Sequence, residues 1–417
     1  MLSDGAFRSV RNILVERIAD YANCVIGDAD KVQFLDCSMS RGLTGVAFTI
    51  GQCAELREDP SLGELAAKLL RFILSSTSLR QWRLSGLFDG LAGVAFCASK
   101  TPFYCNNTSL LEQLDRRVGA LAGKQMQAIA EVGSDGLRAE MWDLISGLSG
   151  IALSRIGRNL RGEQQDELVG WLTLMVKLAE SDGSSPSWKC YPFQTPDAYL
   201  RESFPSGLLN CGLAHGVAGM LGTLSIARVA GYELIGMDRA IDKLANWLAG
   251  QVIYDSYGPS WPSAVHLEPA EETTIPTRSA WCYGPAGIAA VLLNASIVTG
   301  DRALENLART TLKAILLRSL CERRTPSPTF CHGYSGFLLI LKQLSERWDD
   351  ESLQGGLHLE LERILTFIDA SQPFCYRDES GDPAGIGLLD GLSGILLSIE
   401  SSLSVLRSPT ARLFCLQ

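Results

Sequence analysis

One short pattern occurs seven times along this chain of 417 residues and limits the folds that it can adopt. The pattern is Gly-x-x-Gly followed by an apolar run, and its first glycines are Gly42, Gly90, Gly147, Gly216, Gly284, Gly333 and Gly391. The intervals between copies leave room for two helices and their loops, and no strand-like alternation recurs between them. The sequence therefore predicts a repeat of helical hairpins.

Two kinds of helix are expected in each repeat. The run after each Gly-x-x-Gly is apolar nearly all round, as in helices buried on several sides, whereas residues 301–320 carry apolar groups on one face only. We therefore predict an all-α fold, an α/α toroid of seven helical hairpins with an inner and an outer helix layer, that forms a single domain over residues 1–417. An open solenoid is the alternative that the repeats alone leave.

Two segments interrupt the helical rhythm. Residues 181–209 are rich in proline, serine and aromatic residues, and residues 254–280 contain four prolines. Long irregular connections in a compact fold often have a function. We expect these segments to form a lid or a peptide-binding loop, with a plain surface excursion as the alternative.

Composition limits the partners and the location. The net charge is −9 and the basic residues are scattered among acidic ones, so the chain lacks the basic surface that nucleic acid binding requires. The first residues lack a secretory signal, and the longest apolar runs fall short of the roughly 18 residues that cross a bilayer. We expect a soluble, cytoplasmic protein without a transmembrane segment, in which the 12 cysteines are reduced.

Alignment of the copies on their first glycine places equivalent residues side by side in the expected fold. The residue before this glycine is never aliphatic, and in order it is Arg41, Asp89, Ser146, His215, Tyr283, His332 and Asp390. This position should face a polar centre. One residue earlier, the fifth and sixth copies both have a cysteine, at Cys282 and Cys331.

Cys282, Cys331 and His332 form the candidate metal site. A single cysteine is most often a small buried core residue. Two cysteines in the same register of adjacent copies, with a histidine next to one of them, favour a ligand set instead. Two thiolates and an imidazole suit one tetrahedral Zn²⁺ with its fourth position open to water or substrate, which is typical of catalytic zinc.

Candidate catalytic residues lie close to the same register. His215 is the expected acid or base, with a core histidine as the alternative. Asp143 lies one helical turn before the glycine of the third copy, and it either orients His215 or caps the helix that follows. Arg278 is either a cation placed near a developing anion or a surface arginine.

The other residues of this register have weaker functional expectations. Trp281 and Tyr283 flank Cys282 and are candidates for the substrate cavity, although aromatic residues at a helix start more often serve in packing. Arg41, Asp89 and Asp390 are expected to form ion pairs with a structural role.

These motifs resemble the LanC lanthipeptide cyclases. The resemblance covers essentially the whole chain, with seven Gly-x-x-Gly copies, GLAHGVAG around His215, WCYG around Cys282 and CHGYSG around Cys331. WCYG and CHG at this separation are specific together, whereas a single Gly-x-x-Gly is not. One departure is GPAG from Gly284, because the family commonly has its proline one residue later. A proline is tolerated in a first helical turn.

The resemblance implies an α/α toroid in which Cys282, Cys331 and His332 hold zinc. Some members of the family also carry a small α/β extension, for which residues 181–209 and 254–280 are the candidates. The resemblance also implies that His215 is the acid or base, supported by Asp143 and Arg278. The implied reaction is a cyclisation. A peptide cysteine thiolate adds to a dehydroalanine or dehydrobutyrine of the same peptide and closes a lanthionine or methyllanthionine thioether ring.

Partners follow from the same resemblance. The implied substrate is a dehydrated lanthipeptide precursor peptide. A separate dehydratase is implied, because the seven copies leave no room for a fused one. An exporter is a further candidate partner, and a cytoplasmic cyclase of this kind is expected to associate peripherally with a membrane biosynthetic complex.

Two other functions fit the same residues. One is addition of glutathione or another thiol to dehydrated peptides, as the eukaryotic relatives of this family suggest. The other is a zinc-stabilised scaffold that binds peptides without catalysis, although such a scaffold has no need of His215. A carboxylate-based glycosidase has less support, since no paired acids recur at the site position beyond Asp89 and Asp390.

Overall fold

The computed structural model describes residues 4–27, 36–75, 83–132, 136–180, 186–195, 197–268, 277–377, 385–404 and 411–416. These residues form helices, with two short two-stranded sheets among them. The chain divides into two compact units. The first unit comprises residues 1–84, 88–115 and 325–411, and the second comprises residues 85–87, 116–324 and 412–417. The expectation of a single domain stays a prediction.

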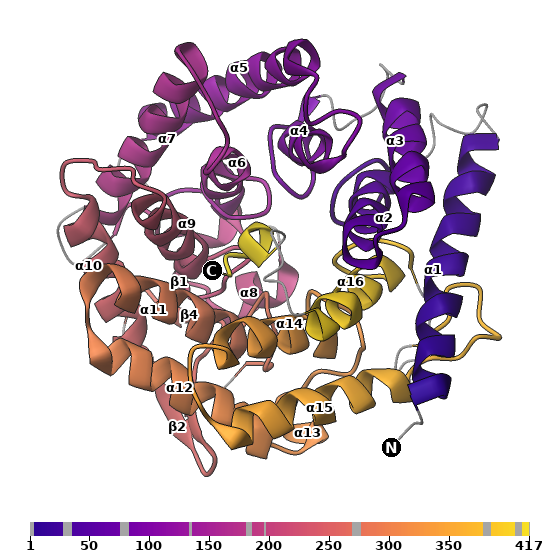
Figure 1. Ribbon diagram of the computed structural model, residues 1–417. Coiled ribbons are helices and arrows are strands. Elements are labelled where there is room, and N and C mark those ends of the chain that lie inside the picture. Colours follow the sequence, from indigo (N-terminus) through magenta and orange to yellow (C-terminus); the bar gives the residue numbers. More distant parts are fainter. Residues whose placement is uncertain are drawn as a thin grey trace. The chain divides into compact units, whose positions relative to one another are not determined.

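The first unit contains four of the repeat copies. Their buried helices are α2 (Leu43–Arg57), α4 (Leu91–Lys100), α14 (Tyr334–Ser345) and α16 (Leu392–Leu403). They pack in the order α14, α16, α2, α4, as Figure 1 shows for this unit. The covering helices are α1 (Asp4–Gly27), α3 (Pro60–Ser75) and α15 (Glu351–Thr366).

The contact between α16 and α2 joins the seventh copy to the first. An open solenoid keeps its first and last repeats at opposite ends and lacks such a contact. That alternative is therefore excluded. The seventh buried helix, α16, is covered by α1, which comes from the other end of the sequence, rather than by a helix that follows it.

The second unit contains the other three copies. Their buried helices are α6 (Leu148–Arg155), α9 (Val217–Val229) and α11 (Pro285–Thr299), and α9 lies between the other two (Figure 1). Covering helices are α7 (Glu163–Glu180), α10 (Met237–Gly250) and α12 (Arg302–Leu317). Helix α5 (Thr108–Val132) contains the boundary of the two units, and the short helices are η3 (Ala139–Met141) and α13 (Leu320–Arg323).

The two irregular segments meet in the second unit. Strand β1 (Leu208–Asn210) pairs antiparallel with β4 (Ala264–His266), so the end of one segment lies beside the middle of the other. Around this sheet lie η4 (Pro192–Gln194) and α8 (Ala198–Ser203), while β2 (Ile253–Asp255) and β3 (Gly258–Ser260) form a separate hairpin. Residues 181–185, 196 and 269–276 of these segments lie outside the described residues.

The glycines of the pattern allow a close contact between each buried helix and the loop before it. At Gly394, in the first turn of α16, an added Cβ would collide with the main-chain oxygen of Leu388 in the preceding loop. The first glycine of the fifth copy, Gly284, differs from the others because its φ is +105°, a region that favours glycine. This is the copy with the displaced proline, and Pro285 is the first residue of α11.

A segment from the end of the sequence packs inside the second unit. Residues Leu413 to Leu416 are buried, and η5 (Ala411–Phe414) begins this segment. The indole of Trp281 donates a hydrogen bond to the carbonyl of Phe414 (3.0 Å), and Asn294 of α11 donates to the carbonyl of Cys415 (2.9 Å). Segment 412–416 therefore contacts both α11 and the loop before it.

None of the helices within the described ranges combines the length and the apolar character needed to cross a membrane.

Candidate functional site

Main-chain hydrogen bonds connect equivalent residues of successive copies. In the first unit, the amide of Cys331 donates to the carbonyl of Leu389, that of Leu389 to Ser40 and that of Ser40 to Phe88, each at 2.8 Å. All four residues stand two positions before the first glycine of their copy. In the second unit, Ala214 donates to the carbonyl of Cys282 in the same way, at 3.1 Å.

This ladder sets the place of the next residue in each copy. The residue before the first glycine is partly or fully exposed in all seven copies, while the glycine after it is buried. Side chains at this position therefore reach solvent beside those of the adjacent copies of the same unit. The sequence predicts that this position faces a polar centre, and the structure shows that its residue is partly or fully exposed in every copy.

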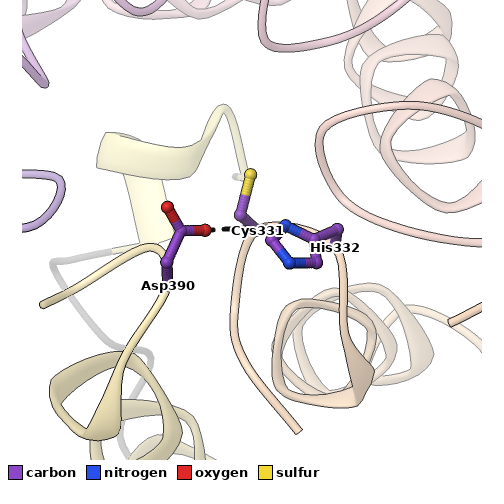
Figure 2. Close-up of side chains that lie close together, drawn as sticks. All are labelled: Cys331, His332 and Asp390. Atoms are coloured by element: carbon purple, nitrogen blue, oxygen red, sulfur yellow. Dashed lines mark ion pairs between the residues drawn. The ribbon is translucent and has the colours of Figure 1, made fainter. Parts of the chain in front are cut away.

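Cys331, His332 and Asp390 gather in the first unit, as Figure 2 shows. Their thiol, imidazole and carboxylate donor atoms all lie within 4.8 Å of one another, and each residue is partly buried. Cys331 and His332 belong to the loop before α14, and Asp390 belongs to the loop before α16. Together they form a donor set that fits a borderline metal such as Zn²⁺.

The two carboxylate oxygens of Asp390 have different partners. Its Oδ2 accepts a hydrogen bond from Nε of Arg41 (3.1 Å), and its Oδ1 lies 3.5 Å from Nδ1 of His332. His332, Asp390 and Arg41 occupy the same register position in the sixth, seventh and first copies. The expected ion pair of Arg41 with Asp390 is therefore present, and it extends to the candidate metal ligand.

His215 and Asp143 are in direct contact in the second unit. Nδ1 of His215 lies 2.6 Å from Oδ2 of Asp143. The other carboxylate oxygen of Asp143 accepts hydrogen bonds from the amides of Ser146 and Gly147, both at 2.8 Å. Asp143 thus does both things that the sequence left open: it contacts His215, and it holds the turn that starts α6.

The environment of His215 favours its charged form. Burial lowers the pKa of the imidazole, but the hydrogen bond and the negative charge of Asp143 more than offset this effect. The pKa of His215 therefore lies above the ordinary value for histidine. Its side chain remains 42% exposed, so the ring is accessible to a proton donor or acceptor from outside the protein.

Cys282 lies in the second unit, in the loop that carries Trp281 and Tyr283. Cys282 is buried, and its carbonyl accepts hydrogen bonds from Leu213 and Ala214, which precede His215. The rings of Tyr283 and His215 lie 6.5 Å apart. Trp281 is fully buried and makes an edge-on contact with Phe414. Its place in a substrate cavity stays a prediction.

Tyr283 is held by a residue that the sequence did not suggest. Asn210, at the end of β1, donates a hydrogen bond from Nδ2 to the Tyr283 hydroxyl (3.0 Å) and accepts one from the amide of Gly212 (2.9 Å). Burial, only partly offset by this hydrogen bond, raises the pKa of Tyr283, which keeps the phenol neutral. The β1–β4 sheet thus reaches the loop beside the candidate site.

Arg278 is exposed, and its main chain packs against Gly284. Among the described residues, Asp390 is the member of the metal-donor group that the sequence reasoning had assigned to a structural role. The sequence holds a signal for it, because Asp390 occupies in the seventh copy the register position that His332 occupies in the sixth.

Comparison with known proteins identifies relatives along nearly the whole chain. Residues 33–410 match the family model described as lanthionine synthetase C-like protein. The curated protein "Nisin biosynthesis protein NisC" of Lactococcus lactis subsp. lactis is 23% identical over an alignment of 412 residues, which covers 94% of this chain and 92% of that protein.

A solved structure named "Nisin cyclase" has a similar fold. Its TM-score is 0.78 at 21% sequence identity, with coverage of 95% of this chain and 96% of that chain. This match confirms the predicted fold class, an all-α fold of the α/α toroid type.

Proposed function

Because this chain belongs to the lanthionine synthetase C-like family, we propose that it is a zinc-dependent lanthipeptide cyclase. Its reaction is the intramolecular addition of a peptide cysteine thiol to dehydroalanine or dehydrobutyrine, which forms a thioether ring. The observation that carries this proposal is the contact between His215 and Asp143, since a protein that only binds peptide has no use for a histidine whose charged form is stabilised.

The proposed zinc ligands are Cys282, Cys331 and His332. Cys282 and Cys331 occupy the same register position in consecutive copies, and His332 follows Cys331 directly. Support also comes from the gathering of donor atoms around Cys331 and His332 in the first unit. When bound, zinc lowers the pKa of a thiol and keeps it as a nucleophilic thiolate at neutral pH.

His215 is the proposed proton donor. Addition of the thiolate to the alkene carbon produces an enolate, which must receive a proton to give the finished ring. A charged imidazole can supply it from Nε2, because Asp143 engages the other ring nitrogen, Nδ1. We assign Arg278 to the stabilisation of the enolate charge, a role that an exposed guanidinium can perform once the peptide is bound.

The proposed substrate is a dehydrated precursor peptide, which a separate dehydratase supplies. This fits the relative named for nisin biosynthesis. We place the reaction in the cytoplasm, with an exporter and a membrane-associated biosynthetic complex as further partners.

A direct test incubates the zinc-loaded protein with its dehydrated precursor peptide. Free thiols are then alkylated and counted by mass spectrometry. We expect alkylation to disappear as rings close. His215→Asn should retain zinc and leave the thiols free, whereas Cys282→Ala should lose zinc as well.

A matched control is His358→Asn, because His358 is an exposed histidine on α15 in a surface pair with Glu362. It should behave like the unchanged protein. Thiols that persist with the unchanged protein at the uncatalysed level would refute the cyclase. Thiols that are lost only when glutathione is present, with a matching mass increase of the peptide, would instead identify addition of an external thiol.

A further inference from the structure

Three donor atoms of different chemistry converge in the first unit. Cys331, His332 and Asp390 each offer one atom within 4.8 Å of the other two (Figure 2). The proposed zinc ligands include Cys331 and His332 but not Asp390. A carboxylate oxygen is nevertheless a regular ligand of zinc, at about 2.0–2.2 Å.

The oxygen of Asp390 that faces the cluster lacks a hydrogen bond. Oδ1 is buried and accepts none from the described residues, although it lies 3.5 Å from Nδ1 of His332. A buried carboxylate oxygen without a donor is costly, and such an atom calls for an explanation. A metal ion bound to Cys331 and His332 would provide the missing partner.

We propose that Asp390 is a displaceable fourth zinc donor, which occupies the position that the substrate thiol takes over. This inference rests on the proposed zinc ligands Cys282, Cys331 and His332. Tetrahedral zinc with three protein ligands has one remaining position, and a carboxylate there protects the metal from other ligands until the peptide arrives.

Charge makes the exchange possible. A carboxylate and a thiolate each carry one negative charge, so replacing one by the other leaves the net charge of the metal site unchanged. The proton of the incoming thiol passes to the solvent buffer. The exchange therefore needs no further charged group in the site.

Arg41 gives the released carboxylate a second partner. It already binds the other oxygen of Asp390, and its side chain is 74% exposed. Arg41 leaves Oδ1 free for the metal, but its positive charge draws electron density from the carboxylate and weakens Asp390 as a metal donor. An exposed ion pair of this kind is worth little energy, so the effect is modest.

The test measures thiol binding to the cobalt-substituted protein. Cobalt(II) replaces zinc, 2-mercaptoethanol is the probe, and the rise in thiolate-to-cobalt charge-transfer absorbance gives its Kd. Without Asp390 the fourth position is open, so Asp390→Asn should bind the thiol about tenfold more tightly if the carboxylate occupies that position about nine-tenths of the time. The same variant should bind the metal itself about 10- to 100-fold more weakly.

A second variant has the opposite expected effect on the thiol. Arg41→Gln removes the positive charge that weakens Asp390 as a donor, so the carboxylate should hold the metal more firmly and the thiol Kd should rise. The matched control is Asp89→Asn, because Asp89 has the same register position in the second copy but does not belong to the group of metal donors. It should leave both constants unchanged.

Two results would overturn the inference. One is an equal thiol Kd for Asp390→Asn and the unchanged protein. The other is weaker thiol binding by Asp390→Asn, which is expected if the carboxylate only orients His332. Failure of the unchanged protein to bind cobalt or zinc is a different outcome, since it would refute the proposed zinc site itself.

Discussion

Asp143 shows how one side chain links the local fold to the chemistry. One of its oxygens holds the amides of Ser146 and Gly147, so the carboxylate cannot rotate without breaking the turn before α6. Its other oxygen therefore has a fixed direction, toward Nδ1 of His215. The imidazole gains both an orientation and a stabilised positive charge from a group that the backbone keeps in place.

Replacement of this carboxylate should change the pH dependence of cyclisation. Asp143→Asn keeps an oxygen for the turn but removes the negative charge that raises the pKa of His215. A proton donor must be charged, and a raised pKa keeps it charged to higher pH. The high-pH limb of the kcat/KM profile should therefore move to lower pH, and the rate should fall by about 10²- to 10⁴-fold.

The same measurement has a clear contrary outcome. A limb that stays in place in Asp143→Asn, with thermal stability unchanged, would mean that His215 is not the titrating acid.

At the residue scale, the sequence pointed to residues that the structure brings into contact, such as His215 and Asp143, but not to the atoms that make each contact. Register alone pointed to the position of Asp390, but not to which of its oxygens would face His332. The sequence could not decide whether Asp143 orients His215 or holds the turn before α6. A carboxylate has two acceptor oxygens, and only the structure shows which partner each oxygen binds. Asn210 gave no signal, since its role depends on the β1–β4 pairing.

At the element scale, the Gly-x-x-Gly pattern brings each helix against the loop that precedes it. The glycine is required because the backbone oxygen of that loop occupies the place of a Cβ. The contact is local, because it joins a helix to the loop that directly precedes it. The consequence is that the loop before each buried helix has little freedom, which fixes the ladder of main-chain hydrogen bonds.

Two glycine-to-alanine substitutions in the first unit should have opposite effects. Gly394→Ala places a methyl group against the carbonyl of Leu388 and should lower the free energy of unfolding by about 1–3 kcal/mol. Gly355→Ala lies on the exposed face of α15, where nothing is within 4 Å, and should raise it by about 0.5–1 kcal/mol. Urea denaturation checks both. Equal effects of the two would contradict the proposed role of the loop contact.

The helical hairpins were predictable because their apolar pattern is local. The packing of α1 against α16 could not be predicted, because most of the sequence separates the two helices. An amphipathic pattern shows that a helix has a buried face, but it does not show which helix packs against that face. The two irregular segments could be located by their composition, but their pairing through three-residue strands was too short to produce a strand pattern.

At the scale of the whole molecule, one buried carboxylate joins distant parts of the first unit. Glu400 of α16 accepts hydrogen bonds from Arg11 of α1 (3.0 and 2.5 Å) and from Arg57 of α2 (2.7 Å). Burial raises the pKa of Glu400, but the two guanidinium groups lower it more, so the carboxylate is charged in the folded protein. Three helices thus depend on a single negative charge.

Loss of this charge should destabilise the first unit. Glu400→Gln leaves two partly buried guanidinium groups without their partner and should cost about 3 kcal/mol at neutral pH. A lowered folded-state pKa gives stability that is present above the unfolded value of about 4.3 and is lost as pH falls through the folded pKa. The difference between the two proteins should therefore shrink in acid, as urea midpoints at several pH values would show.

Glu233→Gln is a suitable control, because Glu233 is an exposed acid in a 3.5 Å surface pair with Arg228. Its substitution should change the midpoint little at any pH. A constant difference between Glu400→Gln and the unchanged protein down to strongly acid pH would contradict the assignment of the charge to Glu400.

Segment 412–416 has a consequence for the order in which the protein is made. The second unit is otherwise built from residues up to 324, yet its interior includes Phe414 and Cys415, which the ribosome adds only after the last helix of the first unit. The first unit in turn pairs α1 and α2 with α16. A growing chain can therefore complete neither unit before α16 and segment 412–416 have been added.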